Sequence, residues 1–104
     1  MAIEKTTFEQ LTITTAASSL TSTVHNPGGA GEKYNYAIIT TNGDPIRYRK
    51  DGVAPTASVG HRAASGSTIV LENEDEVQNL KVIRDTDATS NPTLDISYER
   101  RNKV

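Results

Sequence analysis

The sequence contains no cysteine and no tryptophan, and it has one phenylalanine and two histidines among 104 residues. Without thiols, no disulfide can staple the fold, and no thiolate can hold a metal ion or act as a nucleophile. Hydrophobic residues make up 35% of the chain, which is below the usual share for a globular domain. We therefore expect a small core, which leaves room for partner subunits to complete it.

No stretch is apolar for long enough to cross a membrane, and residues 1–15 lack the hydrophobic block of a signal peptide. We therefore expect a protein that is made in a cytosol and has no membrane partner. The 11 basic and 13 acidic residues nearly balance, giving a net charge of −2. This balance disfavours a protein that binds nucleic acid through bulk positive charge.

Short runs of alternating apolar and polar residues recur along the chain, separated by turn signals at intervals of roughly 8–12 residues. This pattern predicts a single all-β domain over residues 1–104, built as an antiparallel β-sandwich or a jelly-roll-like barrel of seven to eight short strands. The clearest expected strands are 34–41, 46–49, 67–72, 80–83 and 93–99, with weaker candidates at 11–14 and 20–24.

The alternation also predicts which side chains face the core. In strand 46–49, Ile46 and Tyr48 should point inward, and Arg47 and Arg49 should point outward. In the other strands the expected inward residues are Tyr34, Tyr36, Ile38, Ile69, Leu71, Leu94, Ile96 and Tyr98.

Two dipeptides that end in glycine, Asn-Gly and Asp-Gly, mark turns in the middle of the chain. Asn42 and Gly43 form a strong hairpin signal, which predicts that strands 34–41 and 46–49 pair with each other. Asp51 and Gly52 predict a tight turn, because glycine accepts a positive φ without steric cost.

Three further segments are expected to lie outside the strands. Asn73 is a candidate N-cap for a helical turn in 74–79, because acidic residues follow it directly. The glycine-rich stretch 26–31 is expected to be a hairpin connection or a flexible tip that touches a partner. Residues 100–104 are expected to form a mobile basic tail.

Residues 1–15 allow two interpretations. Leu11 and Ile13 alternate with threonines, as in an ordinary strand of the same sandwich. Alternatively, Ile3, Phe8, Leu11 and Ile13 are too dispersed to bury much by themselves, and the segment acts as an extended assembly arm that adds a strand to a neighbouring subunit. In that case Phe8, Leu11 and Ile13 are candidate contacts with the partner.

No constellation typical of an enzyme is apparent. His25 and His61 are the only histidines and lie 36 residues apart, whereas a histidine metal site needs several ligands at close spacing. Asp85 and Asp87, like the acidic run 73–76, lie in stretches expected to be solvated, which gives no means of raising a pKa for acid catalysis. We therefore expect no enzymatic activity, no metal and no cofactor.

Three polar residues near the centre of the chain are further candidates for contacts. Arg47 and Arg49 share one face of their expected strand, where they would pair with acidic residues of an adjacent strand or with a neighbouring subunit. His61 is either a turn residue that hydrogen-bonds to neighbouring backbone or a contact residue.

The chain resembles a family of small bacteriophage and prophage proteins in three runs, PIRYRKDGVAPTASVGH, GSTIVLENEDEVQNLKVIR and TLDISYER. The resemblance extends from about Asp44 to Arg100 and implies a virion protein made in the host cytoplasm. The leading expectation is a capsid decoration (cement) protein that binds the major capsid protein on the outer head surface. The resemblance also implies a homo-oligomer, commonly a trimer. A head–tail connector or tail component, and a carbohydrate-binding module of a virion fibre, are the alternatives.

Overall fold

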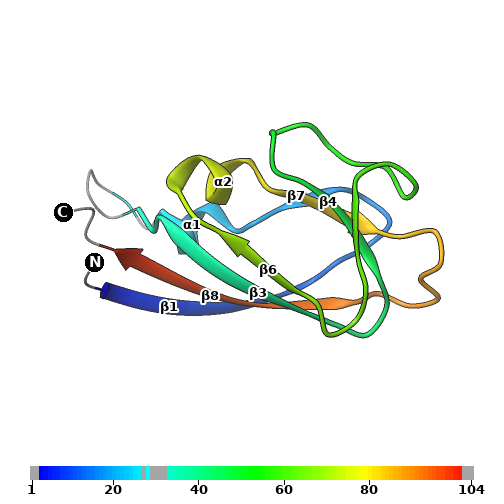
Figure 1. Ribbon diagram of the computed structural model, residues 1–104, viewed down its shortest axis with the longest axis horizontal. Helices are drawn as coiled ribbons and strands as arrows, with labels where there is room; N and C mark the ends of the chain where they lie inside the picture. The colour runs from blue at the N-terminus through cyan, green and yellow to red at the C-terminus, as the bar shows by residue number, and fades with distance from the viewer. Residues whose placement is uncertain (1–2, 27, 29–32, 102–104) are drawn as a thin grey trace.

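The computed structural model describes residues 3–26, 28 and 33–101, which form two antiparallel four-stranded sheets packed face to face (Figure 1). Sheet A has the strand order β1-β8-β3-β6, and sheet B has the order β2-β7-β4-β5. The expectation of an all-β antiparallel sandwich is confirmed.

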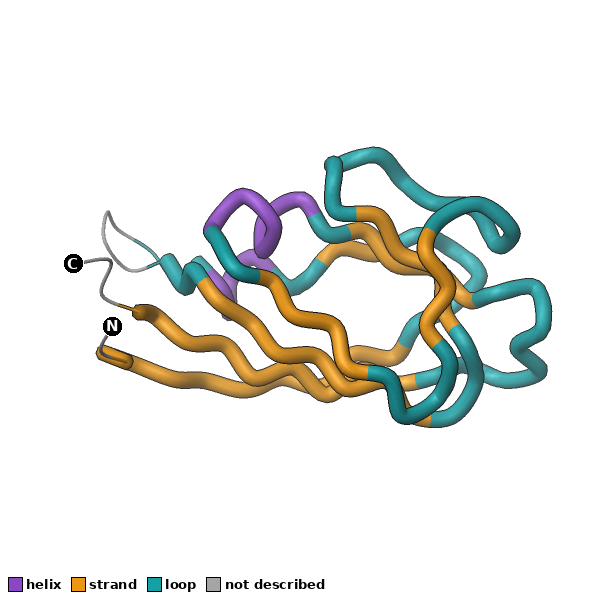
Figure 2. Tube along the Cα trace, in the orientation of Figure 1, coloured by secondary structure: helices purple, strands orange, loops and turns teal. Residues whose placement is uncertain are grey.

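Sheet A contains β1 (Ile3–Thr12), β8 (Thr93–Arg101), β3 (Tyr36–Asn42) and β6 (Thr68–Leu71). Sheet B contains β2 (Ser18–Ser19), β7 (Lys81–Arg84), β4 (Ile46–Arg49) and β5 (His61–Ala63). Two short helices, α1 (Ser22–His25) and α2 (Glu74–Asn79), complete the described elements. The longest strands, β1, β8 and β3, run side by side along the molecule (Figure 2).

The core lies between the sheets and is filled by alternate strand residues. The predicted inward positions are confirmed at Ile46, Ile69, Leu71, Leu94, Ile96 and Tyr98, which are all buried. Tyr48 is half-buried and packs against this cluster. Burying these side chains is the main favourable contribution to the stability of the fold.

The predicted phase of β3 is wrong by one residue. Ala37, Ile39 and Thr41 are buried, whereas Tyr36 and Ile38 point to the outer side of sheet A. Ala37, Ile38 and Ile39 are consecutive apolar residues, so alternation alone does not select a face here, and a shift of one residue exchanges the two faces.

The turn at Asn42 and Gly43 does not make the predicted hairpin. Gly43 has the expected positive φ of 89°, but β3 belongs to sheet A and β4 to sheet B. The turn therefore carries the chain from one sheet to the other. The strand partners are β8 and β6 for β3, and β7 and β5 for β4.

The two helices have opposite outcomes. The predicted helical turn is confirmed as α2, whose N-cap Asn73 accepts a hydrogen bond from the Glu76 N–H at 2.9 Å. The expected strand at 20–24 is wrong, because β2 ends at Ser19 and α1 follows. Leu20 and Val24 both pack against the core, and their spacing of four residues suits one face of a helix as well as a strand.

The N-terminal segment is paired within its own chain. Residues 3–12 form β1, which pairs with β8 from Ile3 to Thr12, with an irregularity between Ile3 and Lys5. Leu11 packs against the core, and Ile13 is fully buried. The structure therefore agrees with the first interpretation, in which this segment is an ordinary strand of the same sandwich.

Two other terminal and loop expectations are only partly covered by the structure. Arg100 and Arg101 belong to β8, so a mobile tail starting at residue 100 is wrong for these two residues, and 102–104 lie outside the described residues. Most of the stretch 26–31 also lies outside them, including residues 27 and 29–31.

Gly60 is the glycine that the fold needs most. Its φ is 135°, and a Cβ there would lie 3.1 Å from both Pro55 Cβ and the Tyr48 carbonyl oxygen. We expect Gly60→Ala to lower the free energy of unfolding by about 2–3 kcal/mol, through backbone strain and the crowded contacts. Gly52→Ala is the control, because Gly52 shares a positive φ of 82° but has no contact closer than 3.6 Å. Urea unfolding of both variants tests this, and equal losses would contradict it.

Candidate functional site

The central motif is organised around the buried carboxylate of Asp85, which follows β7. Arg47 Nε on β4 donates to Asp85 Oδ1 at 2.5 Å, and Arg62 Nε on β5 lies 3.6 Å from Oδ2. The Asp87 N–H donates to Oδ2 at 3.0 Å, and Arg47 also donates to the Gly60 carbonyl at 3.0 Å. The Asp87 N–H and then Arg47 hold the pKa of Asp85 below its usual value. This carboxylate is therefore an internal anchor that holds three segments of the chain together.

Arg47 is consequently not an exposed contact residue. Its side chain is 23% exposed and that of Asp85 only 1%. Arg47 was expected to pair either with an acidic residue of an adjacent strand or with a neighbouring subunit. In the structure it pairs with Asp85, an acidic residue directly after the adjacent strand β7. The expected outward direction of Arg47 is correct, but the expectation that Asp85 is solvated is wrong, because hydrogen bonds and cations from three segments enclose its carboxylate.

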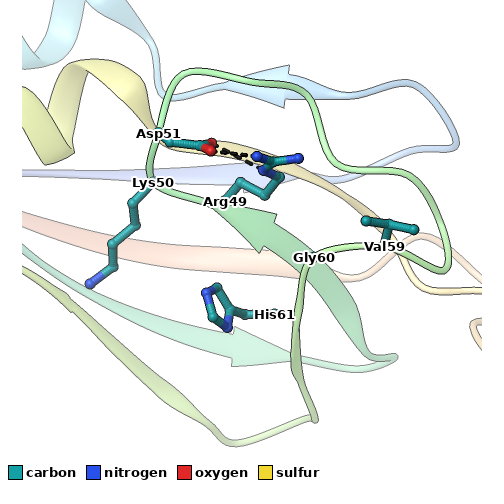
Figure 3. Close-up of a pocket in the computed structure, with 6 residues that line it drawn as sticks. All are labelled: Arg49, Lys50, Asp51, Val59, Gly60 and His61. Atoms are coloured by element: carbon teal, nitrogen blue, oxygen red, sulfur yellow. Dashed lines mark hydrogen bonds and ion pairs between the residues drawn. The ribbon is translucent and has the colours of Figure 1, made fainter.

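A shallow hollow of about 480 Å³ lies beside β4 and β5 (Figure 3). Its lining residues are Arg49, Lys50, Asp51, Val59, Gly60 and His61. The Arg49 guanidinium is turned towards Asp51 and forms an ion pair with it. Lys50 extends away and donates to the Val70 carbonyl at 3.2 Å. The arginine and the lysine of this hollow therefore already have partners within the chain.

His61 is exposed and begins β5, so its interpretation as a turn residue is wrong. Its ring lies 5.4 Å from the Tyr48 ring, measured between centroids. The two residues are paired in register across β4 and β5, so both rings lie on the same face of sheet B.

A second polar cluster, which the sequence did not reveal, joins β1, β8 and α1. The Glu9 carboxylate accepts hydrogen bonds from Tyr98 Oη at 2.5 Å, from Thr21 Oγ1 at 2.6 Å and from the Thr21 N–H at 3.3 Å. Burial first, and then Glu9, raises the pKa of Tyr98, so this hydroxyl remains a donor. His25 is 6% exposed, and its ring centroid lies 6.1 Å from that of Tyr98.

The outer face of sheet A is formed by four paired strands, of which β1, β8 and β3 are the longest of the described strands. One row crosses all four strands in register: Phe8 opposes Ser97, Ser97 opposes Ile38, and Ile38 opposes Val70. We call Phe8, Ile38 and Val70 the apolar row. Phe8 is 59% exposed, which makes it the most exposed of the large hydrophobic residues described.

Polar residues border the apolar row on both sides. On one side, Asp95 accepts hydrogen bonds from Gln10 and Asn42, both at 2.8 Å. On the other side, the Arg101 guanidinium lies 3.3 Å from the Tyr36 ring centroid and its Nε donates to Glu99 at 2.7 Å. The apolar row, with Ser97 between Phe8 and Ile38, is thus bordered by polar residues that have partners within the chain. Apolar side chains with a polar rim are typical of a protein contact surface.

The structure thus separates the six residues predicted as contacts. Arg47, Arg49 and His61 gather around β4 and β5, where Arg47 is internal. Phe8 lies on the opposite sheet and is the only one of the N-terminal three to face outward, since Leu11 and Ile13 pack into the core. Phe8 was identified from its position in a suspected arm, and its actual setting depends on pairing with a strand about 90 residues later.

No protein family model, curated protein or solved structure matches this chain. Within the described ranges, no group of three or more His, Cys, Asp or Glu residues is placed to hold a metal ion. None of the helices described is long and apolar enough to cross a membrane.

The Asp85 network makes a direct stability prediction. We expect Arg47→Ala to lower the free energy of unfolding by about 2–4 kcal/mol, because it leaves a buried carboxylate without its closest cation. Arg49→Ala is the matched control and should change stability little, because its pair with Asp51 is exposed. Chemical denaturation measures both, and similar effects would contradict the structural role of Arg47.

His25 predicts a pH dependence of stability. Burial lowers the pKa of His25 from its usual value of 6.5, and the Glu9 charge opposes this shift only in part. The unfolded chain therefore binds the proton more readily, and stability should fall as the pH drops below about 6.5.

The measurement compares the free energy of unfolding at about pH 7.5 and about pH 5.5. We expect His25→Gln to reduce the loss seen in the wild type. His61→Gln, which changes an exposed histidine, should leave that loss in place. A wild-type protein that gains stability at the lower pH would contradict the assignment.

Proposed function

We propose that this chain is a non-enzymatic structural protein of a bacteriophage particle, a decoration protein that binds the outer surface of the head through the outer face of sheet A. The observation that carries the proposal is the apolar row, in which Phe8 is 59% exposed on the outer face of a four-stranded sheet. Apolar strips rimmed by polar residues mark sites of protein contact.

The virion assignment is supported by the resemblance over residues 44–100. Several residues of that stretch have internal roles: Arg47 binds both the Asp85 carboxylate and the Gly60 carbonyl. In contrast, β1 lies outside the resemblance and provides Phe8. This division suits a shared scaffold that carries a contact strand particular to its own partner.

The apolar row favours a protein partner over a sugar. Carbohydrate sites usually present an open aromatic face beside polar groups. The Tyr36 ring on this surface is covered on one face by Arg101, and Ile38 and Val70 are aliphatic. The alternative of a carbohydrate-binding module therefore receives less support than binding to the major capsid protein.

The test is co-sedimentation of the purified protein with heads that lack it. We expect Phe8→Ser to weaken binding at least tenfold, about 1.4 kcal/mol, and to leave the thermal melt cooperative. Val59→Ser is the control, since Val59 is similarly exposed at 55% but lines the hollow. Weaker binding by the Val59 variant alone would move the contact to the hollow and contradict the proposal.

The number of copies in purified particles separates the virion roles. On the order of hundreds of copies are expected of a decoration protein that follows the symmetry of the head, whereas about six or twelve indicate a ring at the connector or tail. A particle without the protein would contradict every virion role.

A further inference from the structure

The outer edge of β1 is the longest open strand edge in the described part of the fold. β1 has ten residues, whereas the other edge strands have four in β6, three in β5 and two in β2. Among the described residues, no second strand pairs with β1 beyond β8. Folded proteins usually keep edge strands short or protected, because an open edge offers its backbone groups to another chain.

We propose that β1 pairs antiparallel with β1 of a second copy of this chain, about a twofold axis at Thr7. Sheet A of the two copies then forms one continuous eight-stranded sheet. This inference does not depend on the proposed virion role. It also specifies a twofold pair, where the family resemblance implied a trimer.

Charge complementarity selects this partner and this register. Lys5 and Glu9 lie two residues on either side of Thr7, so a twofold axis at Thr7 places Lys5 of each copy opposite Glu9 of the other. Opposite charges across a strand pair are favourable, and like charges are unfavourable. An axis at Phe8 covers a similar length but places Lys5 opposite Leu11. The β1 edge is therefore complementary to itself in one register.

The environment of Glu9 supplies a second, independent argument. Its half-buried carboxylate is held by Tyr98 and Thr21, and no arginine or lysine among the described residues forms an ion pair with it. A partly buried carboxylate is more stable beside a cation. In the proposed pair, Lys5 of the second copy provides that cation.

The exposed position of Phe8 supplies a third argument. In the same register Phe8 of each copy opposes Thr6 of the other, so the two Phe8 residues are diagonal neighbours on the outer face. Diagonal neighbours lie about 7–8 Å apart, within reach of aromatic side chains. The apolar rows of the two copies thus meet at the axis, and each Phe8 loses contact with water.

The first test uses the absence of cysteine from the chain. Thr7→Cys places two thiols directly opposite each other at the axis, at a Cα separation that a disulfide can span. Under mild oxidation we expect this variant to form a covalent dimer much faster than Thr68→Cys, which lies on the opposite edge of sheet A. Equal rates for the two variants would overturn the proposal.

A mixture of two outward-facing variants checks the register without altering the core. Thr6→Cys and Phe8→Cys oppose each other only across the proposed axis. The mixture should therefore form disulfides faster than either variant alone. Faster reaction of one variant with itself would place the axis elsewhere and overturn the register.

The second test is sedimentation equilibrium of the full chain. We expect the wild type to reach twice the chain mass of 11.2 kDa. Lys5→Glu should raise the dissociation constant at least about tenfold, because the new carboxylate at position 5 of each copy then lies opposite Glu9 of the other. Lys81→Glu, with the same change of charge on β7, should not. A monomer at all concentrations, a trimer, or equal effects of the two variants would overturn the proposal.

Discussion

The buried carboxylate of Asp85 is the constraint on which sheet B and its loops depend. A charge that is 1% exposed must be compensated by cations and hydrogen-bond donors. Arg47 and Arg62 bring β4 and β5 to it, and the Asp85 N–H binds the Pro45 carbonyl at 3.1 Å. Since Arg47 also binds Gly60, the same network closes the long loop between β4 and β5. Three segments that are distant in sequence are thereby fixed around one charge.

This network changes how the family resemblance is understood. The resembling stretch includes both Arg47 and Asp85, and the structure gives both residues an internal role. A pattern of this kind reports how sheet B is built, and it says little about what the protein binds. The surface with the strongest features of a contact site includes β1, which lies outside the resemblance. Under the proposed function, fold and partner are therefore encoded largely in different parts of the chain.

The sequence predicts the fold class and much of the core, because alternation is a local property that Leu94, Ile96 and Tyr98 display clearly. It fails at Ile38, where consecutive apolar residues remove the phase. The pairing of β3 also escapes it, because a turn signal at Asn42 reverses the chain without selecting a sheet. The candidate site is less predictable still. The contact of Arg47 with Asp85 joins residues 38 positions apart. The apolar row depends on the pairing of Phe8 with Ser97 and of Ser97 with Ile38, which are 89 and 59 positions apart.

The charges on β1 bear on specificity as well as on association. Charged residues on an edge strand ordinarily prevent pairing with other chains. Among the charged residues of β1, Lys5 and Glu9 have opposite signs and lie symmetrically about Thr7. A foreign strand without the matching pattern leaves Glu9 opposite an unsuitable residue, whereas a second copy in the proposed register places a lysine opposite Glu9. The same residues that disfavour unrelated strands therefore favour self-pairing. A continuous sheet would also present two apolar rows on one surface, so that a partner with repeated sites engages both and gains avidity without any new type of contact.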